Sequence, residues 1–152
     1  MPVERTGQNR GIMTAPADMN EFNKQVVEEF RANEGKVGGM FAGKNVLLLT
    51  TIGAKSGQER LSPLVYTRDG DRYVVAASMG GAPTNPAWYH NLVANPKVTV
   101  EVGTEKFEAT ATVIEDRAER DRLYAGMVAH AEGFADYETK TTRVIPIVVL
   151  ER

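Results

Sequence analysis

The chain has 152 residues, of which 42% are hydrophobic and 25% charged, with a formal net charge of -2 and no cysteine. This length suits one domain with a substantial core, and the composition excludes a disordered or fibrous chain. The mild acidity argues against a general nucleic-acid binder, because phosphate contacts need a basic face. The absence of cysteine excludes disulfides, thiolate metal sites and cysteine nucleophiles.

The N-terminal stretch MPVERTGQNRGIMTAP is polar and rich in turn formers. It lacks the apolar block of a secretory signal, and no window approaches the roughly 18 apolar residues of a membrane span. We therefore expect a mobile segment over 1–17, one folded domain over 18–152, and a cytoplasmic protein. Apolar residues at helical spacing predict a helix over 18–33 with Asp18 as N-cap, packed on a sheet; contact with a membrane surface is the alternative.

The next elements are strands. The runs NVLLLTTIG at 45–53 and RLSPLVYTR at 60–68 have the length of strands. Pro63 has no N–H for a ladder, so the second run is expected at a sheet edge or a bulge. A DGD turn at 69–71 followed by the run RYVVAAS predicts a hairpin and a third strand.

The second half of the chain continues this pattern. A short helix is predicted at 86–95, with Asn85 as N-cap and Pro86 at the first helical position. KVTVEV and EKFEATATVI predict another hairpin, a polar helix follows at 116–131, and RVIPIVVLE is the last strand. Hairpins join the strands and no βαβ rhythm occurs. The predicted fold is therefore mainly β (α+β), a single antiparallel sheet curled into a small barrel with helices packed outside.

The turn GAKSGQER between the first two strands carries two cations in an acidic chain. Gly53 and Gly57 allow positive φ and a close approach to a ligand, and successive N–H groups of such a turn can form an anion-binding nest. Lys55 adds a point charge, Ser56 a hydroxyl, and Arg60 a planar fork suited to phosphate. A strand follows the turn, so it is not a nucleotide P-loop. The turn predicts an anion site; a solvated hairpin without a ligand is the alternative.

The predicted helix in NPAWYHNLVANP offers free N–H groups and the positive end of its dipole. Trp88 and Leu92 share a face, and Trp88 by itself is more simply explained as core. Asn91 could present its amide to the edge of a heterocycle. His90 and His130 are far apart in the sequence and no GxSxG elbow occurs, so neither a triad nor a metal site is predicted. Any enzyme chemistry would then rest on a cofactor that the protein positions.

Three stretches, LLLTTIGAKSGQERLSPLVY, VVAASMGGAPTNPAWYHNLVANPKVTVEV and RVIPIVVLER, closely resemble the deazaflavin-dependent nitroreductase family. The resemblance runs from about Asp18 to the C-terminus, and the pairing of G-x-x-S-G-x-x-R with NPxWYxNLxANP is specific. It implies a split β-barrel that uses coenzyme F420, a deazaflavin on a ribityl chain with a phosphodiester and an anionic glutamate tail. FMN, which related flavin oxidoreductases use, is the alternative cofactor.

The resemblance also implies a cofactor site built from four segments. These are a phosphate-binding turn, a segment whose backbone edges the ring, a strand end on which the ring lies, and a helix that closes the pocket. The expected cofactor-binding residues are Ala54, Lys55, Ser56, Gly57, Arg60, Leu61, Ser62, Pro63, Leu64, Val65, Ala76, Ala77, Ser78, Met79, Ala87, Trp88, Tyr89, His90 and Asn91.

Two regions depart from the family's pattern. Met79 brings no charge for the cofactor's tail, so that contact is left to other basic residues such as Lys44. Nitroreducing members have an aromatic-rich segment before the last strand. Here that segment supplies His130, Phe134 and Tyr137, with glycine and acids between them, so bulky nitroaromatics are not the expected substrates.

The resemblance implies hydride transfer from the reduced deazaflavin to a quinone, an activated enone or lactone, or a nitro compound. Ser78 is the expected hydrogen-bond donor to the acceptor oxygen, with Tyr66, His130, Tyr137 or water as the proton source. A non-catalytic F420 carrier and a small binding module whose turn holds another anion are the alternatives. No nucleic acid or metal is expected to bind, and the sequence favours a monomer.

Overall fold

The structure is a computed structural model that describes residues 16–38, 43–78 and 84–152, with side chains from Asn23 onward. The predicted mobile segment falls almost wholly outside these residues. The described elements, in chain order, are α1 (Pro16–Ala32), β1 (Val46–Ile52), β2 (Glu59–Val65), β3 (Thr67–Asp69), β4 (Arg72–Ala76), α2 (Ala87–Ala94), β5 (Lys97–Val102), β6 (Glu105–Val113), α3 (Arg117–His130), α4 (Gly133–Lys140) and β7 (Ile147–Glu151).

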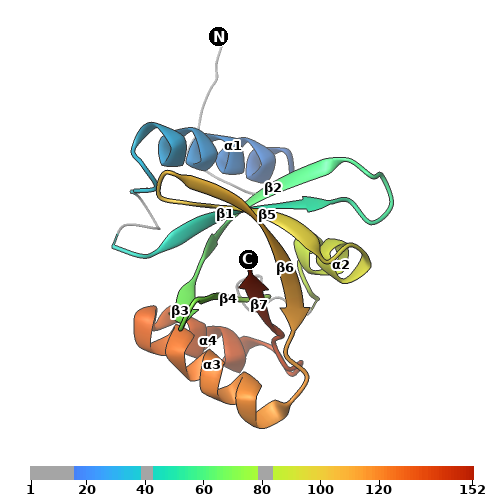
Figure 1. Cartoon of the computed structure of the whole chain (residues 1–152). Helices are drawn as coiled ribbons and strands as arrows, with labels where there is room; N and C mark the ends of the chain where they lie inside the picture. The colour runs from blue at the N-terminus through green and yellow to red at the C-terminus, as the bar shows by residue number, and fades with distance from the viewer. Residues whose placement is uncertain (1–15, 39–42, 79–83) are drawn as a thin grey trace.

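The strands form one antiparallel sheet of seven, in the order β2-β1-β5-β6-β7-β4-β3. Its two edge strands, β2 and β3, are consecutive in the chain and separated only by Tyr66, so the sheet curls until its edges meet there (Figure 1). Because β3 pairs only with Arg72–Val74 of β4, the edge of β4 beyond Val74 has no strand beside it. The sheet is thus a barrel that is joined at Tyr66 and split between β2 and the second half of β4. The predicted curled antiparallel sheet is confirmed.

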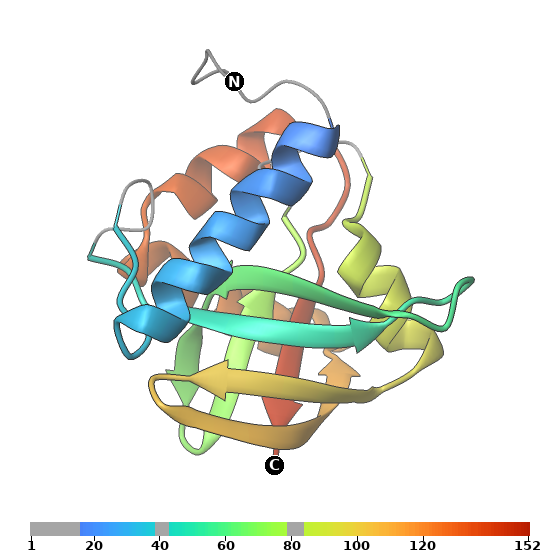
Figure 2. The ribbon, with the colours of Figure 1, turned by 90° about the horizontal axis from the view of Figure 1, so that it is seen from above.

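Alternation along the strands sorts the core into an interior and two outer layers. In β1, Leu47 and Leu49 face the barrel interior, whereas Val46 and Leu48 pack against α1. Strands β4 and β7 alternate in the same way between the interior and the layer of α3 and α4. Figure 2 shows α1 lying across the outer face of β1 and β2. Both faces of these strands are covered, which explains why their sequences are continuous apolar runs.

Helix α1 begins at Pro16, two residues before the predicted N-cap. Val27 and Phe30 bury its apolar face against the sheet, as its periodicity predicted. Its side chains before Asn23 lie outside the described residues, and the expected membrane contact falls partly on them. None of the helices in the described ranges is long and apolar enough to cross a bilayer.

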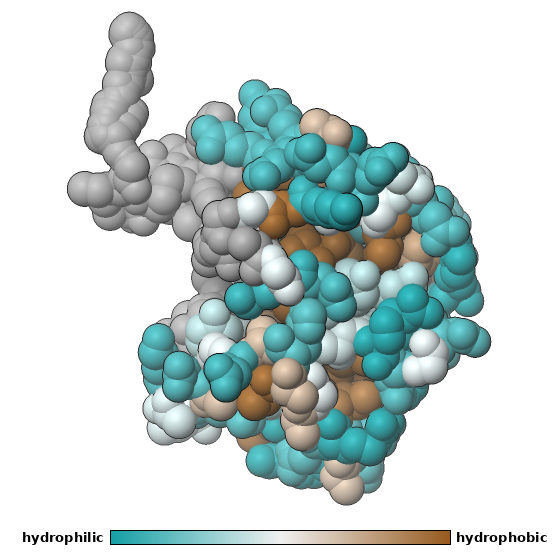
Figure 3. All heavy atoms as spheres, turned by 90° about the vertical axis from the view of Figure 1, so that its left-hand side faces the viewer, coloured by the Kyte–Doolittle hydropathy of each residue, from teal (hydrophilic) through white to brown (hydrophobic). Residues whose placement is uncertain are grey.

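The run at 60–68 is two strands rather than the predicted one. The chain leaves one edge of the sheet and enters the other at Tyr66, whose N–H donates to the backbone oxygen of Asn45 over 3.0 Å. Pro63 lies in β2, an edge strand, as its missing N–H predicted. On the face where β2 passes into β3, apolar atoms appear in separate patches between hydrophilic ones (Figure 3).

The region between α3 and the last strand also differs from the prediction. Helix α4 was not predicted, because it is short and starts at a glycine; it is held by Phe134, which packs on the outer face of β4 and β7. The last strand begins at Ile147 rather than Arg143. The intervening residues cross back over the end of β4 and so carry no strand pairing.

An ion-pair network ties the β3–β4 turn to α3. Asp69 accepts hydrogen bonds from Arg72 and, at 3.2 and 3.1 Å, from the guanidinium of Arg122. Arg122 also binds Glu119, at 2.7 Å. The hydrogen bonds from Arg122, and then from Arg72, lower the pKa of the Asp69 carboxyl from 3.8 to about 2.

We expect the unfolding free energy of Asp69→Asn to fall less in acid than that of wild type. A carboxyl whose pKa is lowered on folding stabilises the native state at every pH above its unfolded pKa. This contribution disappears as the pH falls from about 4 through about 2. The difference in unfolding free energy between wild type and Asp69→Asn should therefore shrink across that window, measured by urea unfolding at several pH values. Asp71→Asn, in the same turn but without an ion pair in the described residues, is the control; an equal effect there would contradict the assignment.

Candidate functional site

The basic turn between β1 and β2 keeps its shape through its own backbone. The N–H of Gly57 donates to the oxygen of Gly53 at 2.9 Å, and the N–H of Gly53 donates to the oxygen of Gln58 at 2.7 Å. Ser56 Oγ folds back and accepts from the N–H of Gln58 at 3.1 Å. Gly57 has a φ of +72°, and a Cβ on Gly53 would collide with Ser56 Oγ. Gly57 thus serves the turn through its conformation, whereas a side chain at Gly53 would displace the Ser56 hydroxyl from its place.

Two N–H groups of this turn are left open. In the described part of the chain, the N–H groups of Lys55 and Ser56 donate to no protein atom, while those of Gly53, Ala54, Gly57 and Gln58 all do. The Lys55 side chain is exposed and makes no ion pair within the same residues. Adjacent free donors beside an unpaired cation form a cradle for an anion.

Arg60 is the second cation of this hairpin and lies on β2, directly after the turn. Every other arginine that the structure describes has a hydrogen bond, an ion pair or a ring contact, whereas Arg60 has none within the described ranges. Arg60 is the cross-strand partner of Thr51, and partners in an antiparallel pair share a face of the sheet. Thr51 bonds to Asn91 of α2, so Arg60 extends from the face on which α2 lies.

Asn91 fastens α2 to the turn, and Figure 2 shows the helix beside the hairpin. Its side chain is 7% exposed; its Oδ1 accepts from the N–H of Ala54 at 3.0 Å and its Nδ2 donates to Thr51 Oγ1 at 3.1 Å. These bonds use one acceptor site and one donor of the amide that the sequence offered to a cofactor edge. Asn91 therefore acts on the site by holding the turn in place.

We expect Asn91→Ala to lower the free energy of unfolding by about 2–3 kcal/mol, because it leaves Thr51 and the N–H of Ala54 without partners. It should also weaken binding of F420 or another phosphate-bearing ligand, since the turn loses its support. Urea unfolding and a ligand titration measure the two effects. Asn95→Ala, one turn further on at an exposed position, should change stability by less than about 0.5 kcal/mol. Equal effects of the two substitutions would refute the role of Asn91.

The rest of α2 divides between core and surface. Trp88 and Leu92 pack inside the barrel, with Trp88 7% exposed, so the core interpretation of the single tryptophan is confirmed. The ring of Tyr89 lies at the edge of that cluster, 5.5 Å from the His90 ring. Ala87 and His90 are exposed. The helix closes one end of the barrel and leaves these two residues on its outer surface.

Strand β2 supplies an open backbone edge. It pairs with β1 alone, so every second residue has backbone groups that point away from the sheet. Leu61 and Val65 pack toward α1, whereas Leu64 packs toward the barrel interior. By alternation Pro63 shares the face of Leu61, and Ser62 that of Leu64. The open edge borders the split in the barrel.

The end of β4 lies across that split. Ala77 faces the interior and Ala76 faces α3 and α4. Ser78 lies beyond the last residue of β4. Its carbonyl and that of Ala77 accept from the same nitrogen of Arg143, so the alternation of the strand does not continue through Ser78. Ser78 is 7% exposed, and within the described residues neither its hydroxyl nor its N–H has a protein partner. Buried polar groups are rarely left unpaired, so Ser78 is well suited to bind a ligand. Met79 lies outside the described residues.

Tyr66 packs against Tyr73 of β4. Its ring lies 5.4 Å from that of Tyr73, edge to face. Burial, and to a lesser degree the neighbouring Tyr73, raise the pKa of the Tyr66 phenol. Tyr66 therefore lies where β2 passes into β3, against the interior cluster that also contains Ala77.

His130 and Tyr137 lie on α3 and α4, the layer that packs against Ala76 of β4. His130 Nε2 accepts a hydrogen bond from the N–H of Asn45 at 3.0 Å, which leaves its proton on Nδ1. The Tyr137 ring packs edge-on against Phe134 at 5.3 Å.

Arg143 is a contact that the sequence did not reveal. It donates to the Asn85 side chain at 2.6 Å and to the backbone oxygens of Ala77 and Ser78 at 3.2 and 2.9 Å. Asn85 was predicted as the N-cap of α2, and that prediction is wrong: the helix begins two residues later without a side-chain cap bond. The amide oxygen accepts from a charged guanidinium, which binds it more strongly than a backbone N–H would.

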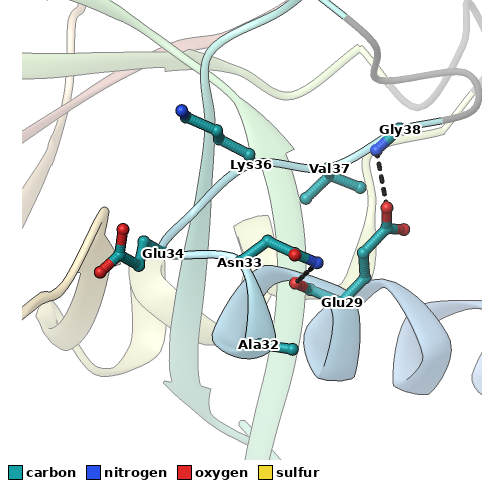
Figure 4. Close-up of a pocket in the computed structure, with 7 residues that line it drawn as sticks. All are labelled: Glu29, Ala32, Asn33, Glu34, Lys36, Val37 and Gly38. Atoms are coloured by element: carbon teal, nitrogen blue, oxygen red, sulfur yellow. Dashed lines mark hydrogen bonds between the residues drawn. The ribbon is translucent and has the colours of Figure 1, made fainter.

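A separate cavity of about 650 Å³ opens at the end of α1 (Figure 4). Glu29 is one of its lining residues: its carboxylate accepts from the N–H of Gly38 at 3.0 Å, and its backbone oxygen from the Asn33 side chain at 2.9 Å. The lining residues are Glu29, Ala32, Asn33, Glu34, Lys36, Val37 and Gly38. Two carboxylates and one lysine do not favour an anion, and the cavity shares no residue with the cradle.

Comparison with known proteins gives a consistent result. The family model of the F420H(2)-dependent quinone reductases matches residues 22–152. An F420H(2)-dependent quinone reductase of Mycobacterium tuberculosis is 41% identical over 129 residues, which cover 81% of this chain and 85% of that protein. A solved F420H2-dependent reductase has a TM-score of 0.65 and 37% identity, over 75% of this chain and 100% of that one. A solved domain-swapped dimer has a TM-score of 0.67 and 34% identity, over 90% and 100%. The chain belongs to the F420H(2)-dependent quinone reductase family.

Proposed function

We propose that this protein is a reductase that uses reduced F420 to convert quinones into hydroquinones. The family match and the relative named as a quinone reductase support the reaction. The observation in the structure that carries the proposal is the cradle, in which two free N–H groups adjoin the unpaired cations of Lys55 and Arg60.

The residues present fit a cofactor with a phosphorylated tail. Lys55, Arg60 and the N–H of Ser56 would hold the phosphate. Asn85 and Asn91 lie on either side of the start of α2. Asn91 contacts the turn, and Asn85 contacts the Arg143 guanidinium that holds the end of β4. The flat ring would then lie in the split, beside the open edge of β2.

When bound, reduced F420 would supply a hydride, and one proton from the protein or solvent would complete the conversion of a quinone into a hydroquinone. The Ser78 hydroxyl would donate to the quinone oxygen as negative charge grows on it. Trp88 and Leu92 fill the barrel behind the split and exclude water from that side. Tyr66, His130 or Tyr137 would deliver the proton, and solvent is the alternative source.

Two measurements test this function. Fluorescence titration of the purified protein with F420 and with FMN determines the preferred cofactor. Oxidation of reduced F420 is then followed with menadione, and with an enone and a nitro compound beside it. Tight binding of F420 with menadione-dependent oxidation supports the proposal. Preference for FMN would favour the flavin alternative, binding without oxidation a carrier, and absence of binding a module for another anion.

A further inference from the structure

Arg143 lies between α4 and β7, and its guanidinium reaches two segments of the candidate site. One nitrogen, Nη2, donates to the backbone oxygens of Ala77 and Ser78 at 3.2 and 2.9 Å, while Nη1 donates to Asn85 Oδ1 at 2.6 Å. All three contacts are partly buried. A single planar group thus ties the end of β4 to the segment that enters α2.

The contact with Ala77 sets the direction of the next peptide group. The N–H of Ala77 donates to the oxygen of Pro146 at 2.9 Å and its carbonyl accepts from Arg143, so both groups point toward the segment leading into β7. The described peptide bonds are all trans, and in a trans peptide the N–H points opposite to the C=O. The N–H of Ser78 therefore points away from β7. On that side β3 has already ended, and the barrel is split.

We propose that Arg143 is a positioning residue that presents the N–H and the hydroxyl of Ser78 together, as a pair of donors to the oxygen of the quinone. This inference rests on the proposed function. Both donors lack a protein acceptor in the described ranges, although Ser78 is buried. Two unpaired donors cost free energy in a buried place unless a ligand accepts from them, and they would gain most from an oxygen that becomes negative.

The geometry requires an arginine. Its planar fork binds the two carbonyls with one nitrogen and Asn85 with another, whereas lysine is a point charge with a single nitrogen. Lysine would keep the positive charge near Ser78 and lose the fixed orientation. The substitution Arg143→Lys therefore separates orientation from charge.

We expect Arg143→Lys to lower kcat with menadione roughly 10- to 30-fold, because the donors at Ser78 are no longer aligned. The Kd for F420, measured by fluorescence, should change by less than about threefold, since Lys55 and Arg60 are untouched. In a double-mutant cycle with Ser78→Ala, the combined loss should be smaller than the product of the single losses. Arg117→Lys, an exposed arginine of α3, is the control and should leave all three quantities unchanged.

A readout on the cofactor-free protein keeps the test independent of activity. In ¹⁵N-labelled protein, Arg143→Lys should shift the amide resonance of Ser78 and leave those of Lys55 and Ser56 in place. Equal losses in kcat and F420 affinity, additive losses in the cycle, or an unmoved Ser78 resonance would each overturn the inference. Wild-type protein that fails to oxidise reduced F420 with menadione would instead refute the proposed function, and the resonance of Ser78 would still decide the role of Arg143.

Discussion

The double substitution Lys55→Ala/Arg60→Ala should raise the Kd for F420 by roughly 30- to 150-fold, equivalent to about 2–3 kcal/mol. Hydrogen bonds to charged groups contribute about 1.5–3 kcal/mol each, and exposure of both side chains to solvent reduces this toward the lower value. Neither side chain makes an ion pair in the described residues, so the substitution breaks no protein contact there. The loss should therefore fall on binding, with little change in the unfolding midpoint.

Salt dependence distinguishes an electrostatic role from a change of shape. The Debye length falls from about 30 Å at 0.01 M salt to about 8 Å at 0.15 M, so the difference between wild type and variant should be largest at low salt. Lys36→Ala/Arg117→Ala removes the same charge from the segment after α1 and from α3, outside the β1–β2 hairpin, and serves as the matched control. Fluorescence titration at both salt concentrations measures the effect. An unchanged affinity in the Lys55/Arg60 variant, or an equal loss in the control, would refute the proposal that this turn binds an anion.

The architecture could be predicted where the signal was local. The DGD and GT turns place Gly70 and Gly103 at φ of +63° and +59°, and each joins the hairpin that the sequence predicted. Covered strands such as β1 appear as continuous apolar runs because helices pack on their outer faces. The switch from β2 to β3 at Tyr66 has no local signal, since the alternation of side chains continues through it while only the pairing partner changes.

In the candidate site too, the local features could be predicted from the sequence and the long-range contacts could not. The cradle lies within one turn, so the glycines and cations that make it are neighbours in the sequence and could be recognised. Asn91 and Arg143 act through hydrogen bonds that span 37 and 66 positions, and no spacing rule predicts such pairs. At Asn85 the local sequence gave a wrong prediction, because this residue has the chemistry of an N-cap but is bound to Arg143 instead.

Ser78→Ala should reduce turnover with menadione by roughly 10- to 100-fold while the Kd for F420 changes little. Loss of one donor to a developing negative oxygen costs about 100- to 1,000-fold in comparable sites, and here the N–H of Ser78 remains as a second donor. The hydroxyl has no protein partner in the described part of the chain, so its removal should not destabilise the fold. A fall in kcat without a matching fall in affinity identifies an interaction made chiefly in the transition state.

The competing possibility is that Ser78 supports the cofactor ring rather than the acceptor. In that case kcat would be nearly retained at saturating F420, and the Kd would rise. Stopped-flow oxidation of the pre-formed complex separates the two, because it measures hydride transfer after binding is complete. Thr112→Ala, an exposed hydroxyl of β6, controls for nonspecific effects and should match wild type. Equal losses in rate and affinity at Ser78 would show that its hydroxyl binds the cofactor and does not stabilise the acceptor oxygen.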